Sequence, residues 1–194
     1  MLKYLGGLLL LGALAITTLA AQAVPSAPRG YLEVAVTYNP MQSNTVGSND
    51  FWTQGGSVQL EGHFWRGLGV VADVAGMHTS KISHSGVGLD MVTATFGPRY
   101  TWLCAHHKVL IFGQGLLGEA NGFNSVFPGK SGATTDADSL AGLAGGGMSF
   151  NLSRRIYLRA VEADWLRTQL PNGTTGVQNN LRLGAGVVFR FGSE

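Results

Sequence analysis

The end of the chain alternates between apolar residues and small or cationic ones. Between residues 181 and 191, every second position is leucine, alanine, valine or phenylalanine, while Arg182 and Arg190 share the other parity with two glycines and a valine. Because side chains alternate across a β-strand, one face of this segment is apolar and aromatic. Its length is that of a tilted strand that crosses a bilayer. The pattern therefore predicts the closing strand of a transmembrane β-barrel.

The same alternation predicts seven earlier strands. They cover residues 31–38, 56–64, 68–77, 89–102, 108–120, 139–150 and 155–167. In the last of these, Arg159 has the opposite parity to Glu162 and Asp164. A bulge near Ala160 and Val161 would bring all three charges to one side. The chain is thus expected to hold eight strands.

The connections between these strands alternate between long and short. The long ones, rich in Asn, Ser, Gly and Thr, cover residues 39–54, 78–88, 121–138 and 169–179, and aromatic residues concentrate near the short turns. Short periplasmic turns, long outer loops and aromatic girdles are typical of outer-membrane barrels. The sequence therefore predicts an all-β fold, an eight-stranded antiparallel up-and-down transmembrane β-barrel over residues 31–191.

Alternation alone leaves open which face of the barrel is inside. A soluble lipocalin-like barrel would turn its apolar face inward around a ligand. Here the polar face is mostly Gly, Ala, Ser and Thr, with a few charges at Glu61, Asp73, Arg99 and Arg182. A water-facing surface would be dense in Lys and Glu, whereas sparse enclosed charges must pair, because a lone buried charge is costly. We therefore predict that the apolar face meets lipid and that these four residues form a polar network in the lumen.

Composition and the first residues agree with an exported membrane protein. Charged residues make up 12% of the chain, about half the usual share in soluble domains. Residues 1–23 carry Lys3, an apolar stretch and an A-x-A site, which predicts a signal peptide, with a retained anchor as the alternative. Residues 24–30 are then a short leader. The formal net charge of +2 argues against a nucleic-acid-binding surface.

The C-terminal region resembles a known family. Gly186, Phe189 and Phe191 resemble the C-terminal assembly signal of bacterial outer-membrane proteins, and residues 155–186 are similar to the eight-stranded outer-membrane β-barrel family. The transmembrane domain of outer-membrane protein A is a well-known member of that family. The resemblance implies a Gram-negative outer membrane, contact with its lipids and recognition by the barrel-assembly machinery. Residues 192–194 extend past the final aromatic residue, where family members commonly stop.

A glycine motif in the fifth strand raises the possibility of a nucleotide cofactor. Residues 113–118 match G-x-G-x-x-G, but a dinucleotide site needs a helix to begin there, and the residues that follow predict a loop. Glycines in a crowded barrel strand are the simpler interpretation, so no cofactor is expected. The glycines also leave open whether Gln114 or Glu119 faces inward, and a bulge would allow both.

The second long loop contains the residues closest to a catalytic or metal pattern. His78 and Ser80, with an acid such as Asp73, would suggest an ester-hydrolysing group at the membrane surface, as in lipid-modifying outer-membrane hydrolases. Nothing in the spacing fixes a nucleophile on a base, so no catalytic residue is assigned. No cysteine or clustered carboxylate completes a metal site around His78 and His84, or around His106 and His107, and no metal is expected.

The sequence therefore predicts a non-enzymatic barrel with a side-chain-filled lumen and a structural or surface-interaction role. A narrow ion-conducting pore, gated by an arginine that changes partners, is the first alternative. A lipid-modifying hydrolase and a soluble ligand-binding barrel are the others. The polar composition of the loops indicates solvation rather than a particular ligand.

Overall fold

The structure, a computed structural model, describes residues 30–44, 50–82, 87–104, 108–129, 132–172 and 176–192. The predicted signal peptide and nearly all of the predicted leader lie outside these ranges, as do His84, His106, His107 and the last two residues. Among the described residues, no helix is long and apolar enough to cross a membrane.

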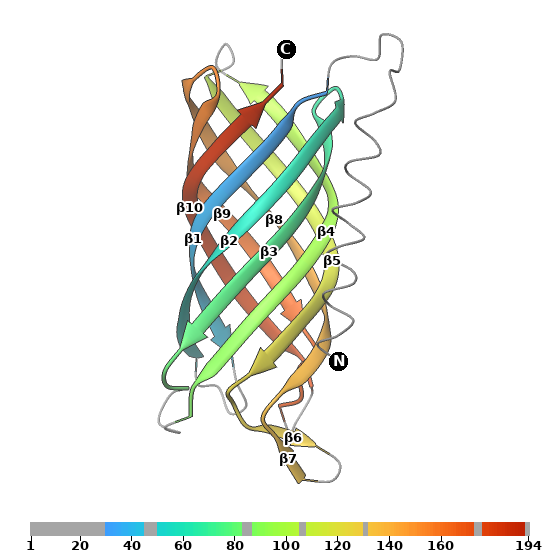
Figure 1. The fold of residues 1–194 in the computed structure, drawn as a ribbon, viewed down its shortest axis with the longest axis vertical. Coiled ribbons are helices and arrows are strands. Elements are labelled where there is room, and N and C mark those ends of the chain that lie inside the picture. The colour runs from blue at the N-terminus through green and yellow to red at the C-terminus, as the bar shows by residue number, and fades with distance from the viewer. Residues whose placement is uncertain are drawn as a thin grey trace.

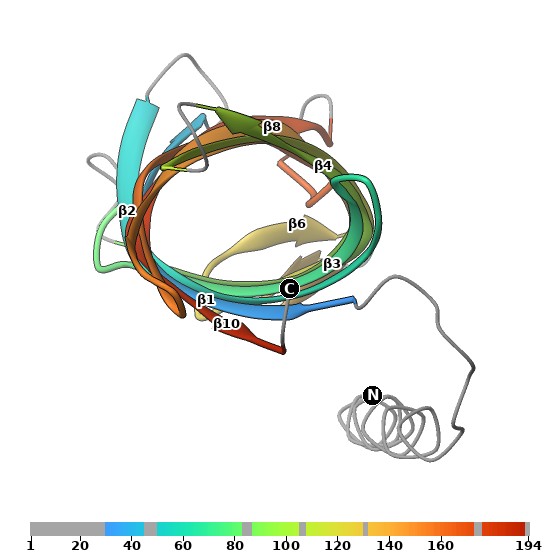
Figure 2. The same cartoon turned by 90° about the horizontal axis from the view of Figure 1, so that it is seen from above.

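Eight long antiparallel strands form a closed barrel, in the order β1-β10-β9-β8-β5-β4-β3-β2 (Figures 1 and 2). The first and last strands pair with each other, from Leu32 opposite Phe191 to Gln42 opposite Leu181, so the sheet has no free edge. A small hairpin, β6 and β7, projects from one end (Figure 1). The strands are β1 (Leu32–Asn44), β2 (Asp50–Trp65), β3 (Leu68–Thr79), β4 (Leu89–Cys104), β5 (Val109–Phe123), β6 (Phe127–Gly129), β7 (Gly132–Thr134), β8 (Ala137–Ser153), β9 (Ile156–Thr168) and β10 (Gln178–Phe191). The predicted fold class is confirmed.

The barrel is inverted relative to a soluble one. Val36, Phe96 and Leu117 point outward and are 50%, 67% and 65% exposed, whereas Glu33 of β1 and Arg99 of β4 are buried inside. Such an exterior is stable only against hydrocarbon, because it leaves a continuous apolar surface uncovered. The predicted orientation, with the apolar face outward, is therefore confirmed.

The two ends of the barrel differ. The start of β1 and the end of β10 lie at the end where two-residue turns join β2 to β3 and β8 to β9 (Figure 1). We call this the periplasmic end and the opposite end, with the longer connections, the loop end. The strands reach further into the loops than predicted, since β1 continues to Asn44 and β5 to Phe123. In these extensions, inward-facing and outward-facing residues still alternate, although the polar composition resembles that of a loop. Met41 and Phe51, for example, are buried.

The predicted bulge in the seventh long strand is present. Against β8 the register shifts beside Ala160, since Val161 pairs with Met148 and Arg159 with Ser149. The shift brings Arg159, Glu162 and Asp164 to the lumen, where all three are buried. In β5 the register against both neighbours is continuous, so only one parity faces inward. Gln114 is buried in the lumen and Glu119 is exposed on the outside.

An apolar cluster fills the loop-end half of the lumen. It includes inward-facing residues of the strands and two residues from the connections, Phe127 of β6 and Leu170, which close the barrel from the loop side. The sequence prediction assigned large apolar residues to the lipid face and did not anticipate this plug. Its members are Met41, Val71, Ala75, Met77, Met91, Leu116, Ala120, Phe127, Ala141, Leu143, Leu166 and Leu170.

Candidate functional site in the barrel lumen

The four charged residues predicted for the lumen all lie in it. Glu61 comes from β2, Asp73 from β3, Arg99 from β4 and Arg182 from β10, and each is at most 2% exposed. They form two separate pairs. Arg182 Nη1 lies 2.9 Å from Asp73 Oδ1, and Arg99 Nη1 lies 2.7 Å from Glu61 Oε2.

Arg182 joins two carboxylates from opposite sides of the lumen. Besides Asp73, its Nη2 and Nε donate to Asp164 Oδ2 of β9, at 2.9 and 3.2 Å. Both carboxylates are completely buried. Since charge-assisted hydrogen bonds strengthen when solvent is excluded, this triad ties β10 and β9 to β3 across the barrel.

Two glutamine side chains connect the arginine pairs into one network. Gln59 Nε2 donates to Asp73 Oδ2 at 2.9 Å and to Glu162 Oε1 at 2.8 Å. Gln114 Nε2 donates to Glu162 Oε1 at 3.0 Å and to Asp164 Oδ1 at 2.9 Å. Each amide therefore supplies both of its protons to carboxylates and leaves its oxygen for the arginines.

Arg99 and Arg159 lie on the aromatic ring of Phe112. Their guanidinium carbons are 4.3 and 4.5 Å from the ring centroid, within cation–π range. Arg99 donates to the oxygens of Gln114, at 3.0 Å from Nε, and Gln59, at 2.6 Å from Nη2. Arg159 Nη1 donates to Glu162 Oε2 at 3.0 Å. Every charge in the middle of the lumen thus has an opposite charge beside it.

The sequence prediction missed five members of this network. The bulge predicted in this strand brings Arg159, Glu162 and Asp164 to one side. Their partners depend on which strands lie opposite, and the alternation of residue types does not predict that arrangement. The role of Gln59 and Gln114 was harder still to predict, because a neutral polar residue that faces inward can equally well fill space without joining a hydrogen-bond network.

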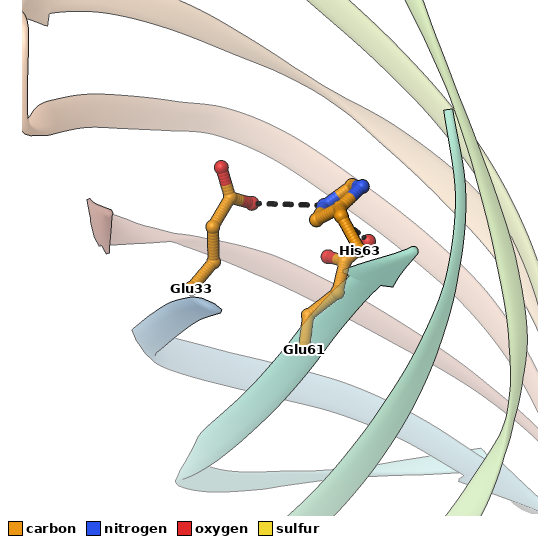
Figure 3. A group of neighbouring side chains, drawn as sticks. All are labelled: Glu33, Glu61 and His63. Atoms are coloured by element: carbon orange, nitrogen blue, oxygen red, sulfur yellow. Dashed lines mark ion pairs between the residues drawn. The ribbon is translucent and has the colours of Figure 1, made fainter. Parts of the chain in front are cut away.

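A second group of polar side chains lies at the periplasmic end. Glu33 at the start of β1 and Glu61 and His63 near the end of β2 converge on one point (Figure 3). His63 Nε2 is 2.8 Å from Glu61 Oε1 and 3.7 Å from Glu33 Oε2. Arg190 donates from Nε to the other oxygen of Glu33 at 2.8 Å, and Tyr31 stacks on the His63 ring with centroids 4.1 Å apart. The sequence prediction did not single out this group.

The loop end contains a cavity of about 250 Å³ above the apolar plug. Its walls are mainly apolar and include Phe51, Leu89, Met91, Phe127 and Leu170. A cavity of this size and lining accommodates a small apolar group rather than a large ligand.

The hydrolase pattern is not assembled as the sequence suggested. Asp73, the acid considered for His78, is bound to Arg182 and Gln59 deep in the lumen. His78 Nδ1 instead contacts Asp90, where β3 ends and β4 begins at the loop end.

The glycine motif and the assembly signal occupy strands. Residues 113–118 lie within β5, which continues to Phe123, so no helix begins at the motif. Gly186 pairs with Thr37, and a Cβ added there would meet Val36 O at 2.0 Å. Phe189 and Phe191 are exposed on the outer face at the end of β10. Their recognition by the assembly machinery stays a prediction.

The fold is similar to that of known bacterial surface proteins. Ail, the attachment invasion locus protein of Yersinia pestis, has a TM-score of 0.58 at 17% identity, covering 84% of this chain and 100% of Ail. It is also known in complex with the heparin analogue sucrose octasulfate. Neisserial surface protein A has a TM-score of 0.60 at 12% identity, covering 82% of this chain and 97% of that protein. No family model and no curated protein matches the sequence.

Identities this low show the fold alone, and that fold is the eight-stranded outer-membrane β-barrel, as the sequence predicts. Together with the apolar exterior, it is the architecture of an integral outer-membrane protein. The bacterial outer membrane is the location that this architecture supports.

Proposed function

We propose that this outer-membrane β-barrel is a non-enzymatic protein with a lumen closed to ions, and that its loop end is its functional surface. The barrel holds that surface at the membrane. The lumen network supplies rigidity rather than a passage.

The filling of the lumen carries this proposal. In the middle, arginine, glutamine and carboxylate side chains meet across the whole section, and the cavity between Glu61, Arg99 and Arg159 measures only about 10 Å³. That is roughly the room for a single water molecule. Above it lies the apolar plug, closed by Phe127 and Leu170. A hydrated ion would have to displace paired charges and then cross a dry apolar layer.

Conductance in a planar bilayer tests the closed lumen. The mature chain, folded in detergent and checked by its heat-dependent shift on a gel, is expected to insert without discrete current steps. A porin added to the same membrane shows that steps are detectable. Reproducible steps from the folded protein would refute the proposal and favour a pore.

One observation favours the pore as the second candidate. Arg99 Nη2 lies 3.9 Å from Glu162 Oε1, so this arginine has a second carboxylate within reach besides Glu61. An exchange between these partners is the movement that a gate would need. The apolar plug argues against it, because moving Arg99 leaves that layer in place.

The proposal of a non-enzymatic role rests on the loop end. Asp90 contacts the imidazole of His78 there and could orient it. Asp73, the acid considered for a hydrolase, is bound to Arg182 in the lumen network. A hydrolase would lose activity on lipid or ester substrates in His78→Ala. We expect the purified protein to show no such activity above that variant.

A sulfated polysaccharide ligand, suggested by the complex of Ail, is not carried over to this chain. Polyanions bind clusters of basic side chains. Near the loop end, the described residues include Asp90, Asp136 and Asp138 against Lys81 and Arg167. The apolar loop-end cavity is the more distinctive feature of this surface, and it supports contact with an apolar group of a partner.

A further inference from the structure

Three potential metal ligands converge at the periplasmic end of the lumen. They are His63 Nε2, Glu33 Oε2 and Glu61 Oε1, and all three atoms lie within 4.8 Å of one another. Figure 3 shows the Glu33 carboxylate beside the imidazole of His63 and the Glu61 carboxylate below it, with a dashed line from Glu33 to the ring. The strand register holds them together, because Glu33 pairs directly with Glu61 in the β1–β2 ladder.

Each carboxylate is held by an arginine through one oxygen and presents the other to the histidine. Glu33 Oε1 accepts from Arg190 Nε at 2.8 Å, and Glu61 Oε2 accepts from Arg99 Nη1 at 2.7 Å. The remaining oxygens, Glu33 Oε2 and Glu61 Oε1, are the ones that face His63. Carboxylates that bind a metal are commonly fixed in this way by a hydrogen-bonding group behind them.

The histidine itself points to a ligand. His63 is 7% exposed, and its Nε2 lies 2.8 Å from Glu61 Oε1 and 3.7 Å from Glu33 Oε2, within reach of both carboxylates. Buried polar groups in native proteins nearly always have partners. His63 Nε2 and the two carboxylate oxygens that face it therefore form a compact, buried group of three potential ligand atoms, and one ion placed among them would contact all three.

We propose that His63, Glu33 and Glu61 form a binding site for a divalent transition-metal ion such as Zn²⁺. Tetrahedral coordination at usual Zn–N and Zn–O lengths places ligand atoms about 3.4 Å apart. The two contacts of His63 Nε2, 2.8 and 3.7 Å, lie on either side of that value, so small side-chain shifts are sufficient. A solvent molecule supplies the fourth ligand. Imidazole nitrogen with carboxylate oxygens is a set that Zn²⁺ and Co²⁺ accept and that Ca²⁺ does not favour.

The neighbouring residues determine the metal affinity of this site and the route by which an ion reaches it. Arg99 and Arg190 offset the charge of the two carboxylates, which limits the affinity, and we expect it in the micromolar range. Tyr31 covers the imidazole, and its ring is also 4.1 Å from the Arg190 guanidinium. The ion therefore enters from the periplasmic end after Tyr31 swings aside. The site shares Glu61 with the charged network, but none of its three ligands belongs to the apolar plug that closes the lumen.

Isothermal titration of the folded, detergent-solubilised mature chain with ZnCl₂ tests the site. The expected result is one Zn²⁺ per barrel, with affinity reduced at least tenfold in both His63→Ala and Glu33→Gln. Glu33→Gln keeps the size of the side chain and a hydrogen-bond acceptor for Arg190. His78→Ala, which removes an exposed histidine at the loop end, is the matched control and should bind like the unchanged protein. The heat-dependent gel shift verifies that each variant is folded.

Co²⁺ gives an independent readout. A site with one imidazole and two carboxylates should produce the intense visible absorption of four-coordinate Co²⁺, and Zn²⁺ should abolish it. Binding that persists in folded His63→Ala, or that disappears in His78→Ala, would assign the ion to surface groups and overturn the proposal. Absence of binding by the unchanged protein at millimolar Zn²⁺ would also overturn it. Neither result bears on conductance, so the two proposals fail separately.

Discussion

Replacing Arg182 with methionine should strongly destabilise the barrel. The substitution keeps most of the side-chain volume but removes the charge that pairs with both Asp73 and Asp164 in the central triad. Arg182 is 2% exposed and both carboxylates are 0% exposed, so none of the three can turn to water. Removing one partner of a buried ion pair costs about 3–5 kcal/mol.

The structure narrows this range. Two carboxylates lose their arginine at once, which pushes the cost upward. Each keeps one amide donor, however, since Gln59 still donates to Asp73 and Gln114 to Asp164. A charged hydrogen bond contributes about 1.5–3 kcal/mol, so these remaining bonds offset part of the loss. We expect the free energy of unfolding to fall by about 4 kcal/mol.

The assay is urea unfolding of the barrel in lipid vesicles, followed by tryptophan fluorescence. The matched test adds Asp73→Asn and Asp164→Asn to Arg182→Met, which removes the orphaned charges. Because replacing all partners of a buried polar group is far less costly than removing one, most of the lost stability should return. A loss below about 1 kcal/mol in Arg182→Met, or no recovery in the triple variant, would refute the triad as a buried, mutually dependent unit.

Three further changes test other parts of the fold. Phe96→Arg on the lipid face should reduce the free energy of unfolding by about 2–4 kcal/mol in vesicles, and an unchanged urea midpoint would contradict a lipid-facing position. Gly118→Ala should cost about 1–3 kcal/mol, because its Cβ would meet Ala94 O at 2.0 Å. Gly76→Ala is the control, since a Cβ there has nothing within 4 Å, and it should be neutral or stabilising. Equal effects of the two substitutions would be inconsistent with this packing. Gln114→Leu should cost about 1–3 kcal/mol, because it removes one donor from Glu162, one from Asp164 and the acceptor of Arg99 Nε. Stability equal to that of the unchanged protein would exclude Gln114 from the network.

The alternation of residue types predicted most of the architecture. In residues 181–191 and over most of β2 and β4, the polar and apolar parities are separated, so the inward face of each of these strands follows from the sequence alone. The bulge in β9 was also predictable, since three charges that cannot face lipid had to share one side.

Two features could not be predicted from alternation. Large apolar residues such as Met41 and Leu116 face inward at the loop end, where the lumen is closed by the plug rather than filled by charges. Residue type alone cannot separate an apolar side chain that meets lipid from one that meets Phe127 inside the barrel. Partners such as Arg182 and Asp73, 109 positions apart, depend on strand register and barrel closure, which single strands do not reveal.

Quenching of tryptophan fluorescence by brominated lipids tests the central claim, that the apolar face of the barrel meets hydrocarbon. All four tryptophans, Trp52, Trp65, Trp102 and Trp165, point outward and are 49–58% exposed. The unmodified protein folded into brominated-lipid vesicles should lose most of its emission, with the strongest quenching by bromines near the interfaces. Emission unaffected by brominated lipids, from a mature chain that stays folded and monomeric in water without detergent, would contradict the account.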